Sequence, residues 1–233
     1  MANLLTLEHG MTIAVSAAMI AALVAAARLR PGAWVVVACR VLAIVIVTNE
    51  ASWSVWAAIH HVWAVNYALP LQLCDIAAFV SAAALWYRRP LLVELTYFWG
   101  LAGTTNGIIT PDLGEHFPSY LFLQYYIAHG AIVGAALLLV VGLRIAPRPW
   151  AAVRMVGFTA GLAVFDGVTD VVTNGNYMYL RHAPGVHSLL DLMGPWPWYL
   201  LTASALALVF FVVLDLPFTI GRRIAARRLV RAL

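Results

Sequence analysis

Several polar side chains that can carry out chemistry lie inside apolar stretches of this 233-residue sequence. They gather toward one end of the expected helices and are Gln72, Cys74, Asp75, Asn106, His129, Asp166 and Asp170. A charged side chain at the centre of a bilayer costs about 2.5–3.5 kcal/mol on insertion scales, so such residues usually face a protein interior or a water-filled cavity. The pattern predicts a polar site inside a bundle of membrane helices.

A cysteine and a histidine in such a site can form an activated nucleophile. The imidazole of His129 would take the thiol proton of Cys74, the thiolate would attack an acyl carbonyl, and the histidine would return the proton to the leaving group. Asp166 and Asp170 are four residues apart on one helical face, so either can orient the imidazole. Candidates to bind the developing oxyanion or the substrate are Gln72, Asn106, Asn176 and Tyr177.

Each of these residues also has a structural interpretation. A buried cysteine more often packs as a small hydrophobic residue than acts as a nucleophile. The structural alternative for His129 is a hydrogen bond to a neighbouring helix. Asp166 and Asp170 can instead be the coupling carboxylates of a transporter or ligand-binding protein. Arg181, in a polar and aromatic loop, can bind a lipid headgroup or lie in an ordinary interfacial turn.

Metal and retinal sites are weaker alternatives. Zinc would need ligands from His116, His129, His182 and His187, but the last two are five residues apart, which suits neither one helical face nor a compact pair, so we predict no metal. All fourteen basic residues are arginine, which excludes a retinal Schiff base because that bond needs a lysine amine. Cys39 and Cys74 are expected near opposite ends of their helices, too far apart for a disulfide.

Composition requires most of the chain to lie in a membrane. The sequence is 64% hydrophobic and 10% charged, and nothing in it predicts a nucleic-acid partner. We expect no cleavable signal peptide, because Glu8 and His9 precede the first apolar run where a basic segment would be needed. Apolar runs between Pro, Gly and Arg breakers predict an all-α bundle with seven transmembrane helices, near 10–28, 34–57, 69–86, 91–110, 119–143, 150–173 and 198–220. Residues 1–221 would form this domain and residues 222–233 a basic tail.

Arginine placement predicts the orientation of the bundle. Thirteen of the fourteen arginines flank the joints on one side of a seven-helix arrangement or follow the last helix, and only Arg181 lies on the other side. The positive-inside rule therefore places the amino terminus outside and the carboxyl terminus in the cytoplasm. Glu50, His60 and His61 are expected at the outer joints.

Four segments of the sequence resemble one protein family. They are Leu69–Asp75, Tyr97–Asn106 with Thr110–Leu113, Gln124–Gly130 and Asn176–Arg181, and they resemble the YwaF-type family of bacterial integral membrane proteins. That family is similar to a vertebrate endoplasmic-reticulum protein that transfers polyunsaturated acyl chains onto ether lysophospholipids through a cysteine. The resemblance implies Cys74 as the acyl-enzyme nucleophile and His129 as its base. Many YwaF-type sequences carry histidine where this chain has Gln72.

We therefore expect a multi-pass protein of the bacterial plasma membrane that acts as a thiol-dependent phospholipid acyltransferase or lipid hydrolase. Membrane phospholipids would be the acyl donors and a lysophospholipid the acceptor, and the mechanism requires no cofactor. Cys74, His129, Asp166 and Asp170 would form the catalytic group, while Arg181 would join the substrate-binding residues Gln72, Asn106, Asn176 and Tyr177. The alternative is a transporter or small-molecule binder that uses the same polar pocket.

Overall fold

The computed structural model describes residues 6–111, 113–185 and 189–232, and across these residues the secondary structure is helical, with no strand. The all-α prediction is thereby confirmed. The elements are α1 (Leu7–Leu29), α2 (Ala33–Ile59), α3 (Leu73–Tyr87), α4 (Pro90–Phe98), the π-helical η1 (Trp99–Thr104), α5 (Thr105–Ile109), α6 (Tyr120–Leu137), the π-helical η2 (Leu138–Gly142), α7 (Ala151–Thr173), the short 3-10 turns η3 (Tyr177–Tyr179) and η4 (Leu189–Met193), and α8 (Trp198–Ala232).

Most helices coincide with the predicted apolar ranges to within a few residues. The α4–η1–α5 series is continuous along the chain, and so is the α6–η2 pair. Five helices are long and apolar enough to cross a membrane: α1, α2, α6 with η2, α7 and α8. The end of α8 differs from the predicted range, because the helix continues to Ala232 and so includes most of the predicted basic tail.

The third helix begins later than predicted, at Leu73 rather than residue 69. Pro70 has no backbone N–H and disfavours a helical conformation in the residue before it. The Asp75 carboxylate accepts the backbone N–H of Gln72 at 3.0 Å, which fixes the helix start at that point. Cys74 is therefore the second residue of α3, and not a residue well inside the helix as the sequence suggested.

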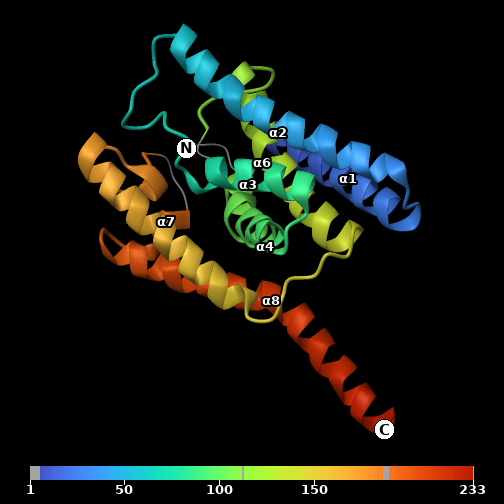
Figure 1. The fold of residues 1–233 in the computed structure, drawn as a ribbon. Coiled ribbons are helices and arrows are strands. Elements are labelled where there is room, and N and C mark those ends of the chain that lie inside the picture. The colour runs from blue at the N-terminus through green and yellow to red at the C-terminus, as the bar shows by residue number, and fades with distance from the viewer. Residues whose placement is uncertain (1–5, 112, 186–188, 233) are drawn as a thin grey trace.

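The helices form a central group with two flanking pairs (Figure 1). α3, α4 and α6 lie at the centre, α1 and α2 cover one side, and α7 packs against α8 on the other. Buried residues concentrate on the central helices and include the large side chains Phe98, Ile132, Leu138 and Leu139. α1, α7 and α8 instead expose many Val, Leu and Phe side chains, as expected of helices that face lipid.

α2 contradicts one detail of the predicted joints. It continues to Ile59, so Glu50 lies within the helix and is buried, with 7% of its surface exposed, and not in an outer loop. The apolar runs 43–47 and 55–59 flank this polar segment within one continuous helix, so the helix continues past the carboxylate. Glu50 consequently belongs with the polar residues of the bundle interior.

The end of the bundle that carries most arginines contains one buried ion-pair cluster. The carboxylate of Glu94 in α4 is almost fully buried and accepts hydrogen bonds from Arg148 Nε at 2.9 Å and from Arg154 Nη2 at 2.8 Å. It also accepts the backbone N–H of Arg148 at 2.9 Å. The side-chain hydrogen bond to Glu94 raises the pKa of Arg148 above its usual value. Glu94 therefore joins the middle of α4 to the loop before α7 and to α7 itself.

Candidate functional site

Cys74 lies in the first turn of α3 and is half-buried. Its Sγ donates to Oδ1 of Asp75 at 3.5 Å, within the range for a sulfur donor. The other oxygen of that carboxylate holds the Gln72 N–H at the helix start. Glu50 lies near enough to interact electrostatically with both the thiol and Asp75. The group that accepts the hydrogen bond of the thiol is thus a carboxylate.

His129 lies inside α6 and is buried. Its Nδ1 lies 2.8 Å from the carbonyl oxygen of Tyr125, and its ring stacks on the Tyr125 ring with centroids 4.1 Å apart. Because a carbonyl only accepts hydrogen bonds, Nδ1 carries the proton in this contact, and Nε2 of the neutral ring is left as an acceptor. The Tyr125 carbonyl thus occupies the orienting position that Asp166 or Asp170 was expected to take.

Two glycines connect the surroundings of Cys74 and His129. A Cβ atom at Gly103 would lie 2.8 Å from the Leu73 side chain, and one at Gly107 would lie 2.8 Å from Cδ2 and 2.9 Å from Nε2 of His129. Positions four apart on a helix share a face and are about 6 Å apart along the axis. The first turn of α3 and the imidazole therefore pack on adjacent turns of the same segment. Across the described residues no hydrogen bond joins Cys74 to His129.

Asp166 and Asp170 are fully buried on α7. Asp170 Oδ1 accepts the backbone N–H of Tyr177 at 2.7 Å, whereas its Oδ2 and both oxygens of Asp166 have no hydrogen-bond partner among the residues that the structure describes. Asp166 interacts electrostatically with Asp170 and with Asp75. We call Glu50, Asp75, Asp166 and Asp170 the acidic cluster. It brings together carboxylates from α2, α3 and α7.

Residues 176–182, which we call the strap, cross the end of α3 that carries Cys74. Gln72 Oε1 accepts the Met178 N–H at 2.8 Å. The Tyr177 hydroxyl donates to the Val65 carbonyl at 2.7 Å and accepts the Leu69 N–H at 3.1 Å. Burial raises the pKa of Tyr177 above its ordinary value of 10.0, so the hydroxyl keeps its proton and remains a donor at neutral pH. The structure thus brings the predicted residues Gln72, Tyr177 and Asp170 together around the start of α3.

The family comparison covers this whole region. The model of the TMEM164 family matches residues 4–215, a range that includes Cys74, His129, the acidic cluster and the strap, and that ends before the last five arginines. The chain belongs to the TMEM164 family. Comparison with curated proteins and with solved structures found no match. Together with its apolar helices, membership of this membrane protein family makes the chain a multi-pass membrane protein.

The other predicted binding residues of this TMEM164-family protein have partners within the protein. Asn106 Nδ2 donates to the Ala102 carbonyl at 2.6 Å, and Asn176 Nδ2 donates to the His182 carbonyl at 2.9 Å. Arg181 is exposed, and its Nη1 donates to Asn174 Oδ1 at 2.8 Å. These donors are therefore already engaged.

Donors for an oxyanion are instead available at the start of α3. The first amides of a helix have no carbonyl partner within that helix, and here they belong to Leu73 and Cys74. Sequence reasoning missed them because they are backbone groups. The signal that could have found them is the spacing of Gln72 and Asp75, which marks a helix start just before the cysteine.

Metal ligation has no geometric support in the parts of this TMEM164-family protein that the structure describes. No group of three or more His, Cys, Asp or Glu side chains is arranged there to hold a metal ion. His116 lies 3.4 Å from Glu8, His182 contacts Asn176, and His187 lies outside the described residues. A surface hollow of about 420 Å³ borders the strap, between His182, Gly194, Trp196 and Tyr199, and its lining does not include Cys74 or His129.

Proposed function

We propose that this TMEM164-family protein is a membrane-embedded lipid acyltransferase or lipid hydrolase with Cys74 as its nucleophile. The observation that supports this most is the thiol itself, which is half-buried at a helix start, bonded to Asp75 and close enough to Glu50 of α2 for an electrostatic interaction. A cysteine that only filled a gap would need no such neighbours. The resemblance to YwaF-type proteins and to the vertebrate ether-lipid acyltransferase supports the same role.

The proposed reaction has two halves. Cys74 Sγ attacks the carbonyl carbon of a phospholipid ester, a C–S bond forms, the ester C–O bond breaks, and the thiol proton passes through Asp75 to the leaving lysophospholipid oxygen. The amides of Leu73 and Cys74, at the positive end of the α3 dipole, stabilise the oxyanion.

In the second half, a lysophospholipid hydroxyl or water attacks the thioester. His129 Nε2 accepts the proton of that nucleophile, the C–S bond breaks, and the thiolate takes the proton back. The Tyr125 carbonyl supports this role because it holds the other ring nitrogen as the donor. Asp166 and Asp170 act at longer range, through the acidic cluster and the strap.

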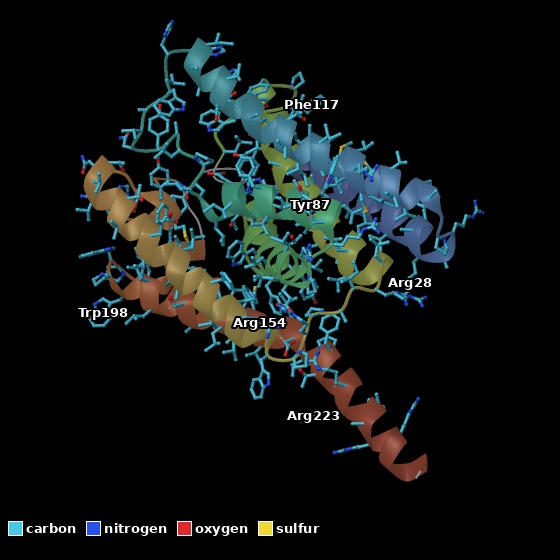
Figure 2. All side chains as sticks on the ribbon, viewed as in Figure 1. Arg28, Tyr87, Phe117, Arg154, Trp198 and Arg223 are labelled. Carbon is cyan, nitrogen blue, oxygen red and sulfur yellow. The ribbon has the colours of Figure 1, made fainter. Side chains whose placement is uncertain are left out.

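The proposal includes the predicted topology in a bacterial plasma membrane. α3 and the α4–η1–α5 series would span the bilayer beside the five longer helices, giving seven spans with the amino terminus outside and the carboxyl terminus in the cytoplasm. In support, Arg28, Arg154 and Arg223 lie toward one end of the bundle, whereas Phe117 and Trp198 lie toward the other (Figure 2). Aromatic side chains favour the interface, and arginines favour the cytoplasmic side.

The test is acyl transfer by purified protein in lipid nanodiscs with a labelled phospholipid donor and a lysophospholipid acceptor. Cys74→Ala should lower the rate by at least about 100-fold, as expected for loss of a nucleophile. Cys39→Ala is the matched control. Cys39 is fully buried near the start of α2, away from Glu50 and the acidic cluster. Intact-protein mass spectrometry should show a thioester on Cys74. Full activity of Cys74→Ala would contradict the proposal.

One observation favours a second candidate, a proton- or cation-coupled transporter. The Asp166 carboxylate is fully buried, and within the described part of the chain neither of its oxygens has a hydrogen-bond partner, a state that a bound proton or cation would relieve. In that case Asp166→Asn would abolish solute flux in proteoliposomes, and Cys74→Ala would leave the flux intact. Under the acyltransferase proposal, Cys74→Ala instead abolishes most of the activity that is measured.

A further inference from the structure

The strap is attached on both of its sides. Toward α3, Tyr177 and Met178 bond to Val65, Leu69 and Gln72. Toward α8, the Tyr199 hydroxyl donates to the Tyr179 carbonyl, and Trp196 Nε1 donates to the Leu180 carbonyl at 3.0 Å. Figure 1 shows the connection between α7 and α8 beside the segment that leads into α3. The strap therefore bridges the end of the bundle at which Cys74 lies.

The backbone of the strap is held in an unfavourable conformation. Met178 and Tyr179 have φ values of 51° and 55°, in the left-handed region that residues other than glycine rarely adopt. Such a conformation persists only where the surrounding contacts impose it. The hydrogen bonds of Tyr177 and Gln72 are contacts of this kind, so loss of either should open the strap.

Tyr177 is the centre of this closure. Its side chain is fully buried, its hydroxyl is bonded to two backbone groups of the segment before α3, and its N–H is bonded to Asp170. A buried aromatic ring with a satisfied hydroxyl fills space that water would otherwise enter. The strap thereby covers the segment that leads into α3 just before Cys74, whereas Cys74 itself keeps part of its surface exposed.

We propose that Tyr177 and Gln72 determine reaction specificity, because the strap they hold keeps water from the thioester on Cys74. This inference rests on the proposed acyl-enzyme function. The thioester has two fates: attack by water gives a free fatty acid and the thiol, and attack by a lipid hydroxyl gives a new ester and the thiol. With the strap closed, the acyl group passes to the lipid acceptor.

The first test measures access to Cys74 and needs no enzymatic activity. In a Cys39→Ala background in nanodiscs, Tyr177→Phe should speed modification of Cys74 by a charged methanethiosulfonate about tenfold, because the hydroxyl that is removed makes two hydrogen bonds to the segment before α3. Modification by uncharged N-ethylmaleimide should change little. Gln72→Leu, which removes the acceptor for Met178, is a second variant with the same expected effect.

Tyr67→Phe is the matched control. Tyr67 is exposed in the same segment before α3, and within the described residues its hydroxyl makes no hydrogen bond, so its removal should leave both rates unchanged. Equal rates of charged-reagent labelling in wild type, Tyr177→Phe and Gln72→Leu would overturn the sealing role.

The second test measures the partition of the thioester, as the ratio of free fatty acid to acylated lipid acceptor. Tyr177→Phe should raise this ratio about tenfold, whatever its effect on the rate of acylation. A thioester that forms but partitions as in wild type would overturn the inference and leave the acyltransferase proposal standing. Absence of any thioester in wild type would overturn the proposed function, and the inference with it.

Discussion

A backbone carbonyl, and not a carboxylate, holds the imidazole of His129. The contact from Nδ1 to the Tyr125 carbonyl and the stacked Tyr125 ring leave Nε2 directed at Gly107. A carbonyl keeps its acceptor character at any pH, so this arrangement does not depend on the ionisation of the acidic cluster. The absence of a side chain at Gly107 is what leaves room for the ring.

Gly107→Ala should therefore impair catalysis with little effect on folding. The new Cβ would lie 2.9 Å from Nε2, and the ring must move by some tenths of an ångström or more. Misplacement of a catalytic group by about 1 Å can cost about 100-fold in rate, so we expect a loss of 10- to 100-fold in acyl transfer.

Gly157→Ala in α7 is the control for this change. Among the described residues, no neighbouring heavy atom lies within 4 Å of the position its Cβ would take, so it should keep full activity and gain slightly in stability. Thermal unfolding and acyl transfer measured on both variants separate the two effects. Equal activity of the two variants would show that the position of the His129 ring does not matter.

At the scale of the helices, α4 is joined to its neighbours by the carboxylate of Glu94. Its carboxylate accepts from both arginine side chains and from the backbone of Arg148. The side chain of Arg148 is 48% exposed, and that of Arg154 is 31% exposed, so water weakens the pairing. The cluster therefore contributes less than a fully buried ion pair, for which loss of one partner costs about 3–5 kcal/mol.

Glu94→Gln should destabilise the protein by about 2–3 kcal/mol, the upper range for hydrogen bonds to charged groups. The measurement is chemical unfolding in detergent micelles. Glu115→Gln is the control, because Glu115 is exposed and makes no ion pair within the described residues. A loss no larger than that of the control would mean that the loop before α7 is held by other contacts.

How well each helix could be predicted depends on which sequence features mark its burial and its ends. Apolar runs and Pro or Arg breakers report burial and helix ends, so helices such as α2, α6 and α7 were predicted to within a few residues. The start of α3 was missed because it depends on a hydrogen bond between Asp75 and the Gln72 backbone. The π-helical turn η1, where Thr105 Oγ1 bonds the Gly100 carbonyl at 3.1 Å, leaves no apolar pattern at all.

The candidate site was predictable by residue type but not by partner. Gln72, Cys74 and Tyr177 lie at the same end of α3, as expected of residues in one site. The Asp75 contact to the thiol and the Tyr125 carbonyl beside His129 involve nearest neighbours and backbone atoms, which polar residue types in the sequence do not reveal. The burial of Glu50 depends on packing between α2 and α3, and such packing is not local in sequence.

At the scale of the whole molecule, the arginines define a single basic end. α8 alone is 35 residues long, about 52 Å, and its last part projects away from the bundle (Figure 1). A hydrocarbon core of about 30 Å leaves the arginine-rich end of this helix outside the bilayer. The proposed topology places that end in the cytoplasm.

Cysteine labelling in intact cells tests this topology. In a background without Cys39 and Cys74, a membrane-impermeant maleimide should label Gly114→Cys before lysis and Ala226→Cys only after lysis. Both positions are exposed, so access depends on the side of the membrane and not on burial. The reverse pattern would invert the predicted orientation. Labelling of both positions before lysis would require an even number of spans between Gly114 and Ala226.

α3 is also shorter than the membrane it would cross. Its 15 residues cover about 22 Å, against a hydrocarbon core of about 30 Å. A short helix at the centre of a bundle favours local thinning of the bilayer, at a cost of a fraction of a kcal/mol per ångström of mismatch. In the proposed topology, the depth of Cys74 below the headgroups would therefore depend partly on the host lipids. Longer acyl chains in the surrounding bilayer would then draw the thiol further from the surface.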